Sequence, residues 1–276
     1  MKNRVIAESK KLVMYSRANK LGLQAKLCID VNCDVGESYG AYTIGNDEAL
    51  MKLATSVNIA CGFHAGDPAV MRRTVALAIK HGVSIGAHPG LPDRIGFGRR
   101  MMQITPHDVY DMTLYQIAAL QGFVAAQGGA MRHVKPHGAL YTMLASHEAL
   151  AQSFAQAVID FNNKLIVVGL AGSVFLQIAE CMGLSVAHEA FADRRYQPDG
   201  SLTPRTEPCA LVQSVGEAAA QAVRIAQEHT AVAVDGSEVP IYAQTICLHG
   251  DSPHSTKLAR AVVRSLKSAG IELRAL

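Results

Sequence analysis

Residues 57–68 read Val57-Asn58-Ile59-Ala60-Cys61-Gly62-Phe63-His64-Ala65-Gly66-Asp67-Pro68. A short apolar run ends abruptly in a histidine and an aspartate that stand between glycines. Apolar runs of this length, bounded by Gly and Pro, are typical of buried parallel strands. Polar side chains directly after such a strand are typical of the sites of β/α-barrel enzymes.

The same pattern of apolar run and polar turn recurs along the chain. It is found at residues 27–37, 83–90, 131–138, 184–193 and 245–251. Stretches with helical spacing lie between or after these runs, at residues 68–81, 105–127, 147–162, 174–182, 214–229 and 255–269. Two of them begin with a capping residue followed by proline, Asp67-Pro68 and Thr105-Pro106, which predicts helix starts.

The repeating unit of strand, polar turn and helix predicts a parallel sheet covered by helices, either a closed barrel or an open doubly wound sheet. An open sheet would concentrate polar residues at one switch point. Here they follow many different strands, which a closed barrel brings to one mouth. We therefore expect an α/β fold, a distorted, TIM-like (β/α) barrel of seven or eight strands that forms a single domain over residues 27–276.

Composition is that of one enzyme domain. The chain has 276 residues, of which 49% are hydrophobic and 18% charged, enough for a large core. The net charge of +3 and the lack of basic runs mixed with aromatics give no sign of nucleic-acid binding, and no apolar stretch is long enough to predict a membrane span. Six cysteines without a CxxC pair indicate a reducing compartment, so a cytoplasmic location is expected. Residues 1–26 are predicted to be an extension, poorly ordered or a short helix.

Six motifs, in this order, resemble the LamB/YcsF family, whose members are A subunits of prokaryotic 5-oxoprolinase. They are Asp30-Val31-Asn32-Cys33-Asp34-Val35-Gly36-Glu37, Asn58-Ile59-Ala60-Cys61-Gly62-Phe63-His64-Ala65-Gly66-Asp67, Gly86-Ala87-His88-Pro89-Gly90, Lys135-Pro136-His137-Gly138-Ala139-Leu140-Tyr141, Glu189-Ala190-Phe191-Ala192-Asp193-Arg194-Arg195-Tyr196 and His249-Gly250-Asp251. The resemblance runs from residue 27 to the C-terminus. It implies a barrel like those of glycoside hydrolases and carbohydrate deacetylases. It also implies ATP-dependent opening of 5-oxoproline to L-glutamate, with ADP and phosphate as products, together with subunits B and C.

That reaction needs a general base, donors for developing negative charge and a cation for the substrate carboxylate. If ATP phosphorylates the stable lactam, a positioned water can open the activated ring. The predicted catalytic residues are Asp34, His64, Asp67, His88, Lys135 and His137. The chain has no P-loop signature; whether the partner subunits bind ATP or this chain binds it through Lys135 is left open.

A second set of residues is predicted to bind the substrate: Asn32, Glu37, Arg94, Glu189, Asp193, Arg194, His249 and Asp251. The loop at residues 91–100, with Arg94 and Arg99, is interpreted as a lid over an anionic substrate or as a solvated connector. Arg194 could clamp the substrate, or Asp193 could pair with Arg194 or Arg195 within the loop. Asp30 could serve the site or only support local structure.

Two other functions remain open. The main hypothesis expects no metal, but Asp34, His64 and His88 are ligand types of a metal-dependent deacetylase or amidohydrolase. A noncatalytic subunit that binds a lactam or sugar would not need so many titratable groups. The variants Asp34→Asn, His64→Ala and Lys135→Ala are predicted to lose turnover and keep the fold.

Overall fold

The structure is a computed structural model that describes residues 26–212, 214–248 and 255–276. The predicted extension at residues 1–26, apart from Lys26, lies outside these ranges, and so do His249 and Asp251.

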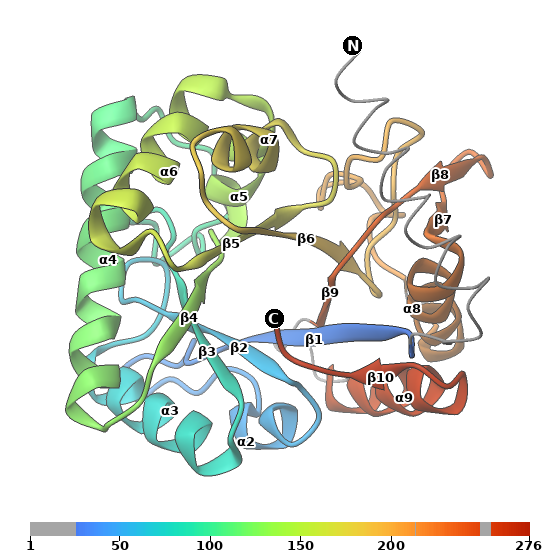
Figure 1. Cartoon of the computed structure of the whole chain (residues 1–276), viewed down its shortest axis with the longest axis horizontal. Helices are drawn as coiled ribbons and strands as arrows, with labels where there is room; N and C mark the ends of the chain where they lie inside the picture. Colours follow the sequence, from blue (N-terminus) through green and yellow to red (C-terminus); the bar gives the residue numbers. More distant parts are fainter. Residues whose placement is uncertain (1–25, 213, 249–254) are drawn as a thin grey trace.

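Seven parallel strands form a closed barrel (Figure 1). In the order around the barrel they are β1 (Cys28–Val35), β2 (Ser56–Ala60), β3 (Ser84–His88), β4 (Met131–Val134), β5 (Ile166–Leu170), β6 (Val186–Phe191) and β9 (Thr245–Leu248). Pairing of β9 with both β6 and β1 closes the ring. The predicted barrel is confirmed, with seven strands.

Helices surround the barrel, and all six predicted helices are confirmed. They are α3 (Pro68–His81), α4 (Pro106–Ala126), α6 (Glu148–Asn162), α7 (Val174–Cys181), α8 (Val215–Glu228) and α9 (Ser255–Ser268). The predicted starts are also correct: Asp67 accepts hydrogen bonds from two backbone amides of α3, and Thr105 forms a capping box with Asp108 at α4. None of the helices in the described ranges is long and apolar enough to cross a membrane.

Several elements were not predicted. They are β5, the short helices α2 (Asp47–Met51) and α5 (Gly138–Ser146), the antiparallel pair β7 (Thr230–Val232) and β8 (Glu238–Pro240), and β10 (Glu272–Leu273), which pairs with β1. Strand β5 has no histidine or charged residue at its C-terminal end, so it lacks the feature that identified the other barrel strands.

The interior of the barrel is polar, because β1 alternates apolar and polar side chains. Asp30, Asn32 and Asp34 contact polar partners on the neighbouring strands β2 and β9, while residues such as Val31 join the apolar core between strands and helices. Asp30 accepts hydrogen bonds from the hydroxyls of Thr55, Ser56 and Thr245 at the N-terminal side of the barrel. Asp30 therefore helps to hold β1 against its neighbours β2 and β9.

Gly86 leaves room for an imidazole that crosses the barrel. His133 reaches from β4 to Asn58 on β2, with 2.8 Å between Nε2 and Oδ1, and a Cβ on Gly86 would lie 2.1 Å from that nitrogen. Gly86→Ala is therefore expected to lower the free energy of unfolding by about 1–3 kcal/mol through overpacking. The check is urea denaturation.

Gly122→Ala is the matched control. Gly122 lies in α4, where an added Cβ would meet nothing within 4 Å, so this change is expected to stabilise the protein by about 0.5–1 kcal/mol. Equal stability of the two variants would contradict the packing argument.

Candidate active site

Lys135 lies at the centre of a buried charge cluster where the strands end. Its Nζ is 2.9 Å from Asp34 Oδ1, 2.9 Å from Glu189 Oε1 and 3.1 Å from Cys247 Sγ. Only 2% of Lys135 is exposed. Burial alone would lower the pKa of Lys135, but the two carboxylates raise it above the ordinary lysine value. The side chain is therefore a fixed ammonium ion.

Two asparagines hold the carboxylates beside this ammonium. Asn58 donates to Asp34 Oδ1 at 2.8 Å, and Asn32 donates to Glu189 Oε1 at 2.9 Å. The amide groups also bond each other, since Asn58 Nδ2 donates to Asn32 Oδ1 at 2.7 Å. Such a network fixes the positions of buried charges that would otherwise be costly.

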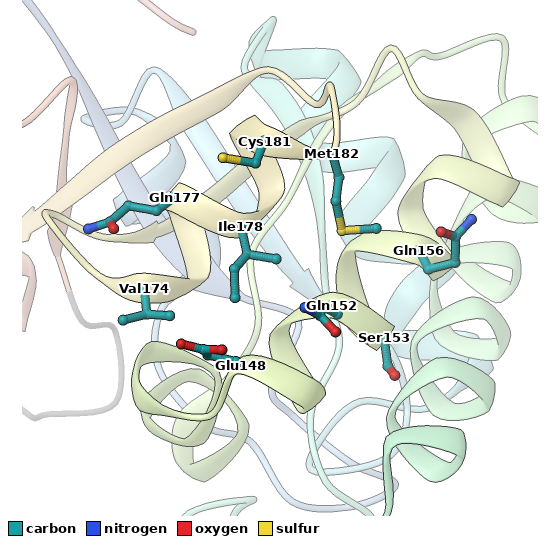
Figure 2. A pocket seen from close by; sticks show the side chains of 9 residues that line it. All are labelled: Glu148, Gln152, Ser153, Gln156, Val174, Gln177, Ile178, Cys181 and Met182. Carbon is teal, nitrogen blue, oxygen red and sulfur yellow. The ribbon is translucent and has the colours of Figure 1, made fainter. Parts of the chain in front are cut away.

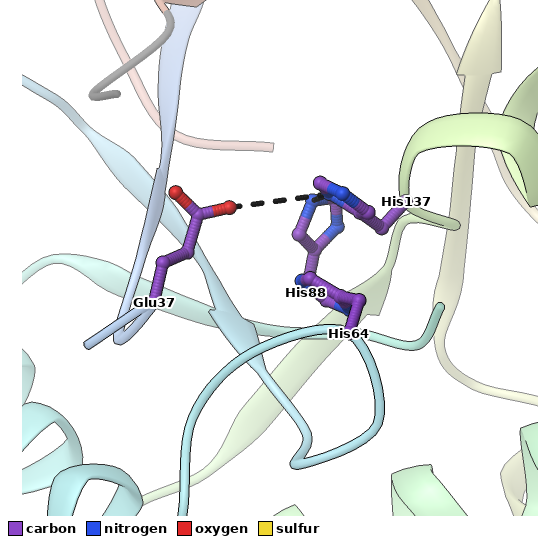
Figure 3. A group of neighbouring side chains, drawn as sticks. All are labelled: Glu37, His64, His88 and His137. Atoms are coloured by element: carbon purple, nitrogen blue, oxygen red, sulfur yellow. Dashed lines mark hydrogen bonds and ion pairs between the residues drawn. The ribbon is translucent and has the colours of Figure 1, made fainter. Parts of the chain in front are cut away.

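Three imidazoles and a carboxylate form one group (Figure 3), and His88 Nε2 of this group lies 3.3 Å from Asp34 Oδ2. The His64 and His137 rings stack with centroids 3.7 Å apart, and His88 lies edge-on to both. Glu37 approaches from the other side, with Oε1 4.0 Å from His137 Nδ1. Burial is the main cause that lowers the pKa of His64 and His137, so both rings are neutral at physiological pH.

The loop at residues 91–100 closes over these imidazoles. The Phe97 carbonyl accepts a hydrogen bond from His137 Nε2 at 2.8 Å, and the Gly98 carbonyl accepts one from the Ala139 amide. Phe97 has a φ of 54°, a strained conformation for an aromatic residue. The loop occupies the place expected of a lid; that it moves stays a prediction.

Asp93 holds this loop together. It accepts hydrogen bonds from the Gly96 and Arg100 amides and from the Arg100 guanidinium, and that guanidinium lowers the pKa of Asp93 to about 2. Because the pKa is depressed, the stabilisation is present above the ordinary value of 3.8 and is lost as the pH falls toward 2. Asp93→Asn is expected to raise the hydrogen-exchange rate of loop amides several-fold at pH 7, and this excess over the parent should shrink between pH 4 and 2.

Asp111→Asn, on the exposed face of α4, is the control and should leave exchange in the loop unchanged. A loop that exchanges equally in the parent and in Asp93→Asn at pH 7 would contradict this role of Asp93.

Two predicted site residues, Asp67 and Arg94, have contacts outside the imidazole group. Asp67 caps α3 and accepts the Gly40 amide, so its contacts are those of a helix cap rather than of the imidazole cluster. Arg94 donates to the carbonyls of Gly62 and Gly66, and its guanidinium lies 3.6 Å from the centroid of the Tyr39 ring, which ties loops together.

Arg194 is buried, and its guanidinium donates to the carbonyls of Thr203 and Ala210. Burial lowers the pKa of Arg194 to about 10. Arg195, the other arginine considered for Asp193, pairs with Glu217. Substrate binding by Asp193 and Arg194 stays a prediction.

Sequence reasoning missed the side chains that surround Lys135 and Glu189. Besides Asn58, these are Tyr141, Phe191 and Cys247, which form an apolar wall with Leu170. The Tyr141 and Phe191 rings meet edge to face with centroids 5.9 Å apart, and Lys135 Nζ lies 6.0 Å from the Phe191 centroid. Tyr141 and Phe191 stand inside the quoted motifs, but apolar residues in a motif do not differ from core residues in sequence.

A hollow of about 720 Å³ lies elsewhere, between α6 and α7 (Figure 2). It is lined by Glu148, Gln152, Ser153, Gln156, Val174, Gln177, Ile178, Cys181 and Met182. Glu148 is the one charged side chain in this lining, and none of the predicted site residues is in it. The candidate site at the strand ends is therefore separate from this hollow.

Comparisons with known proteins agree with the architecture. Residues 29–276 match the sequence profile of the LamB/YcsF family. The A subunit of 5-oxoprolinase from Oceanobacillus iheyensis is 53% identical over 246 residues, which cover 89% of this chain and 96% of that protein. The Bacillus subtilis protein of the same name is 51% identical over 248 residues, covering 90% and 96%. The crystal structure of a lactam utilization protein from Thermus thermophilus superposes with a TM-score of 0.86 at 44% identity, covering 90% of this chain and all of that one.

Proposed function

The chain belongs to the LamB/YcsF family, and from this membership we propose that it cleaves 5-oxoproline to L-glutamate in an ATP-dependent reaction, as the A component of a complex with subunits B and C. The names of the relatives support a role in 5-oxoproline metabolism. The observation that carries the proposal is the buried ammonium of Lys135 between two carboxylates, beside an apolar wall.

The proposed reaction proceeds through an activated lactam. ATP phosphorylates the amide oxygen and leaves as ADP. Water then adds to the activated carbon, the C–N bond breaks, and the nitrogen takes up a proton to become the amine of an acyl phosphate. A second water releases phosphate and leaves glutamate. Each addition of water requires a base and a positive group for the negative charge that develops on oxygen.

The charge cluster around Lys135 supplies these groups. Asp34, next to the imidazoles, is the proposed base, and the Lys135 ammonium stabilises negative charge on the reacting oxygens. Tyr141 and Phe191 offer an apolar surface for the methylene groups of the ring. Burial and the neighbouring Glu189 raise the pKa of Tyr141, so its hydroxyl keeps its proton and can donate.

Arg99 is the proposed cation for the substrate carboxylate. Its charge is one of the smaller contributions, after burial and other charged groups, to the lowered pKa of both His64 and Arg194. The guanidinium is thus within electrostatic reach of two sides of the mouth. It also lies 4.9 Å from the centroid of the Phe97 ring in the loop that covers the imidazoles.

Phosphorylation is assigned to the partner subunits. The lack of a P-loop signature supports this division of labour.

The test measures glutamate release from 5-oxoproline by the purified chain, alone and with subunits B and C, with and without ATP. Release only in the complete mixture with ATP is the expected result. Release by the isolated chain without ATP, abolished by a chelator, would favour a metal-dependent amidohydrolase instead. No release in any mixture would refute the proposal.

A further inference from the structure

We propose that His64, His88, His137 and Glu37 bind one divalent transition-metal ion of the zinc class. One ligand atom from each residue lies within 4.8 Å of the others, and all four residues are buried. This set differs from the sequence-based alternative of Asp34, His64 and His88, because Asp34 Oδ1 already accepts hydrogen bonds from Lys135 and Asn58.

The first argument concerns protons on His88 and His137. A backbone carbonyl accepts hydrogen bonds only, so the 2.7 Å contact to the Lys135 carbonyl places a proton on His88 Nδ1. The 2.8 Å contact to the Phe97 carbonyl likewise places one on His137 Nε2. In neutral rings, the remaining nitrogens carry lone pairs. Ligating histidines are commonly oriented by such a bond from their other nitrogen.

Those two remaining nitrogens face each other. His88 Nε2 lies 3.0 Å from His137 Nδ1 and 3.3 Å from Asp34 Oδ2. Three acceptor atoms therefore converge, which is unfavourable unless a positive charge lies among them. In a tetrahedral zinc site with Zn–N bonds of about 2.0–2.1 Å, ligand atoms are about 3.3 Å apart. To hold such an ion, the His88 and His137 nitrogens must move slightly apart, and Glu37 Oε1, now 4.0 Å from His137 Nδ1, must move closer.

The second argument concerns His64. Its side chain is 1% exposed, and neither ring nitrogen has a hydrogen-bond partner, although buried polar groups are normally paired. The ring is held against the other imidazoles by close glycines: a Cβ on Gly90 would lie 2.4 Å from His64 Nδ1, and one on Gly98 would lie 2.6 Å from His64 Cβ. The backbone thus keeps an unpartnered imidazole against the convergent acceptors.

The donor set fits the zinc class. Imidazole nitrogens with a carboxylate oxygen suit Zn²⁺ and neighbouring transition metals, and buried oxygen-rich sites suit Mg²⁺ or Ca²⁺ instead. A rival explanation is a proton shared by His88 and His137, which makes the pair an imidazolium beside Asp34. If the proposed function holds, the ion would polarise a substrate oxygen near Asp34, but metal binding itself does not depend on that reaction.

The experiment uses the purified full-length chain, stripped with dipicolinate and titrated with Zn²⁺ during equilibrium dialysis, with bound metal measured by mass spectrometry. We expect one ion per chain. His137→Gln and Glu37→Gln should each weaken binding by roughly tenfold or more. His107→Ala, which removes an exposed imidazole at the start of α4, should bind as the parent does.

Spectroscopy of the parent chain keeps the test decisive if a variant folds poorly. X-ray absorption of the zinc-loaded parent should show imidazole nitrogens around the ion, and nitrogen NMR of the stripped parent should change at the histidines when Zn²⁺ is added. Zinc uptake equal in the parent and in a folded His137→Gln, or a zinc-insensitive imidazolium in the NMR spectrum, would overturn the proposal. Either result leaves the glutamate-release test unaffected.

Discussion

Lys135→Met is expected to lower the free energy of unfolding by roughly 3–5 kcal/mol and to abolish glutamate release. The substitution keeps most of the side-chain volume but removes the ammonium between Asp34 and Glu189. Both carboxylates then remain buried without their cation, the most costly way to break a buried ion pair. Urea denaturation and glutamate release by the complete complex measure the two effects.

Two further variants separate charge from packing. Lys164→Met changes an exposed lysine after α6 and should match the parent in both measurements. Adding Glu189→Gln to Lys135→Met removes one uncompensated charge, so the double variant should regain stability without regaining turnover. If Lys135→Met is as stable as the parent, the placement of Lys135 between two buried carboxylates is contradicted. From the sequence alone, loss of Lys135 was predicted to spare the fold. Its burial between two acids predicts a loss of stability instead.

Much of the fold could be predicted because apolar runs, turn residues and helix caps indicate the same strands and helices. Apolar runs with turn residues identify six of the seven barrel strands, and the pairs Asp67-Pro68 and Thr105-Pro106 identify two helix starts. Strand β5 was missed since its end carries no charged residue or histidine. Helix α5 was missed because it begins at Gly138 and follows proline and histidine.

The site could be located from the sequence but not resolved in detail. Barrel closure brings strand ends together, so Asp34, His88 and Lys135 could be predicted to lie near one another. The contacts that divide them into a charge cluster and an imidazole cluster depend on tertiary distances. Asp67 could not be assigned from the sequence, because an aspartate before proline fits both a helix cap and a catalytic acid. In the structure it accepts hydrogen bonds from the Ala69 and Val70 amides, as a helix cap does.

Asp34→Asn is expected to reduce kcat for glutamate formation by about 10²–10⁴-fold, the usual contribution of a general base, while leaving the fold intact. Asparagine has the same shape. Its Oδ1 can still accept from Lys135 and Asn58, and its Nδ2 can donate to His88 Nε2, which now lies 3.3 Å from Asp34 Oδ2. The lost property is therefore basicity rather than packing.

The measurement compares glutamate and ADP formation by the complete complex containing this variant. If partner subunits phosphorylate the lactam before Asp34 acts, a burst of ADP should precede the slowed release of glutamate. Asp111→Asn, on the exposed face of α4, controls for loss of a carboxylate. Parent-like kcat in Asp34→Asn would move the role of base to another group at the mouth, and His88, whose Nε2 faces Asp34, would be next to test. Loss of both ADP and glutamate would instead indicate that Asp34 is needed before the ring is activated.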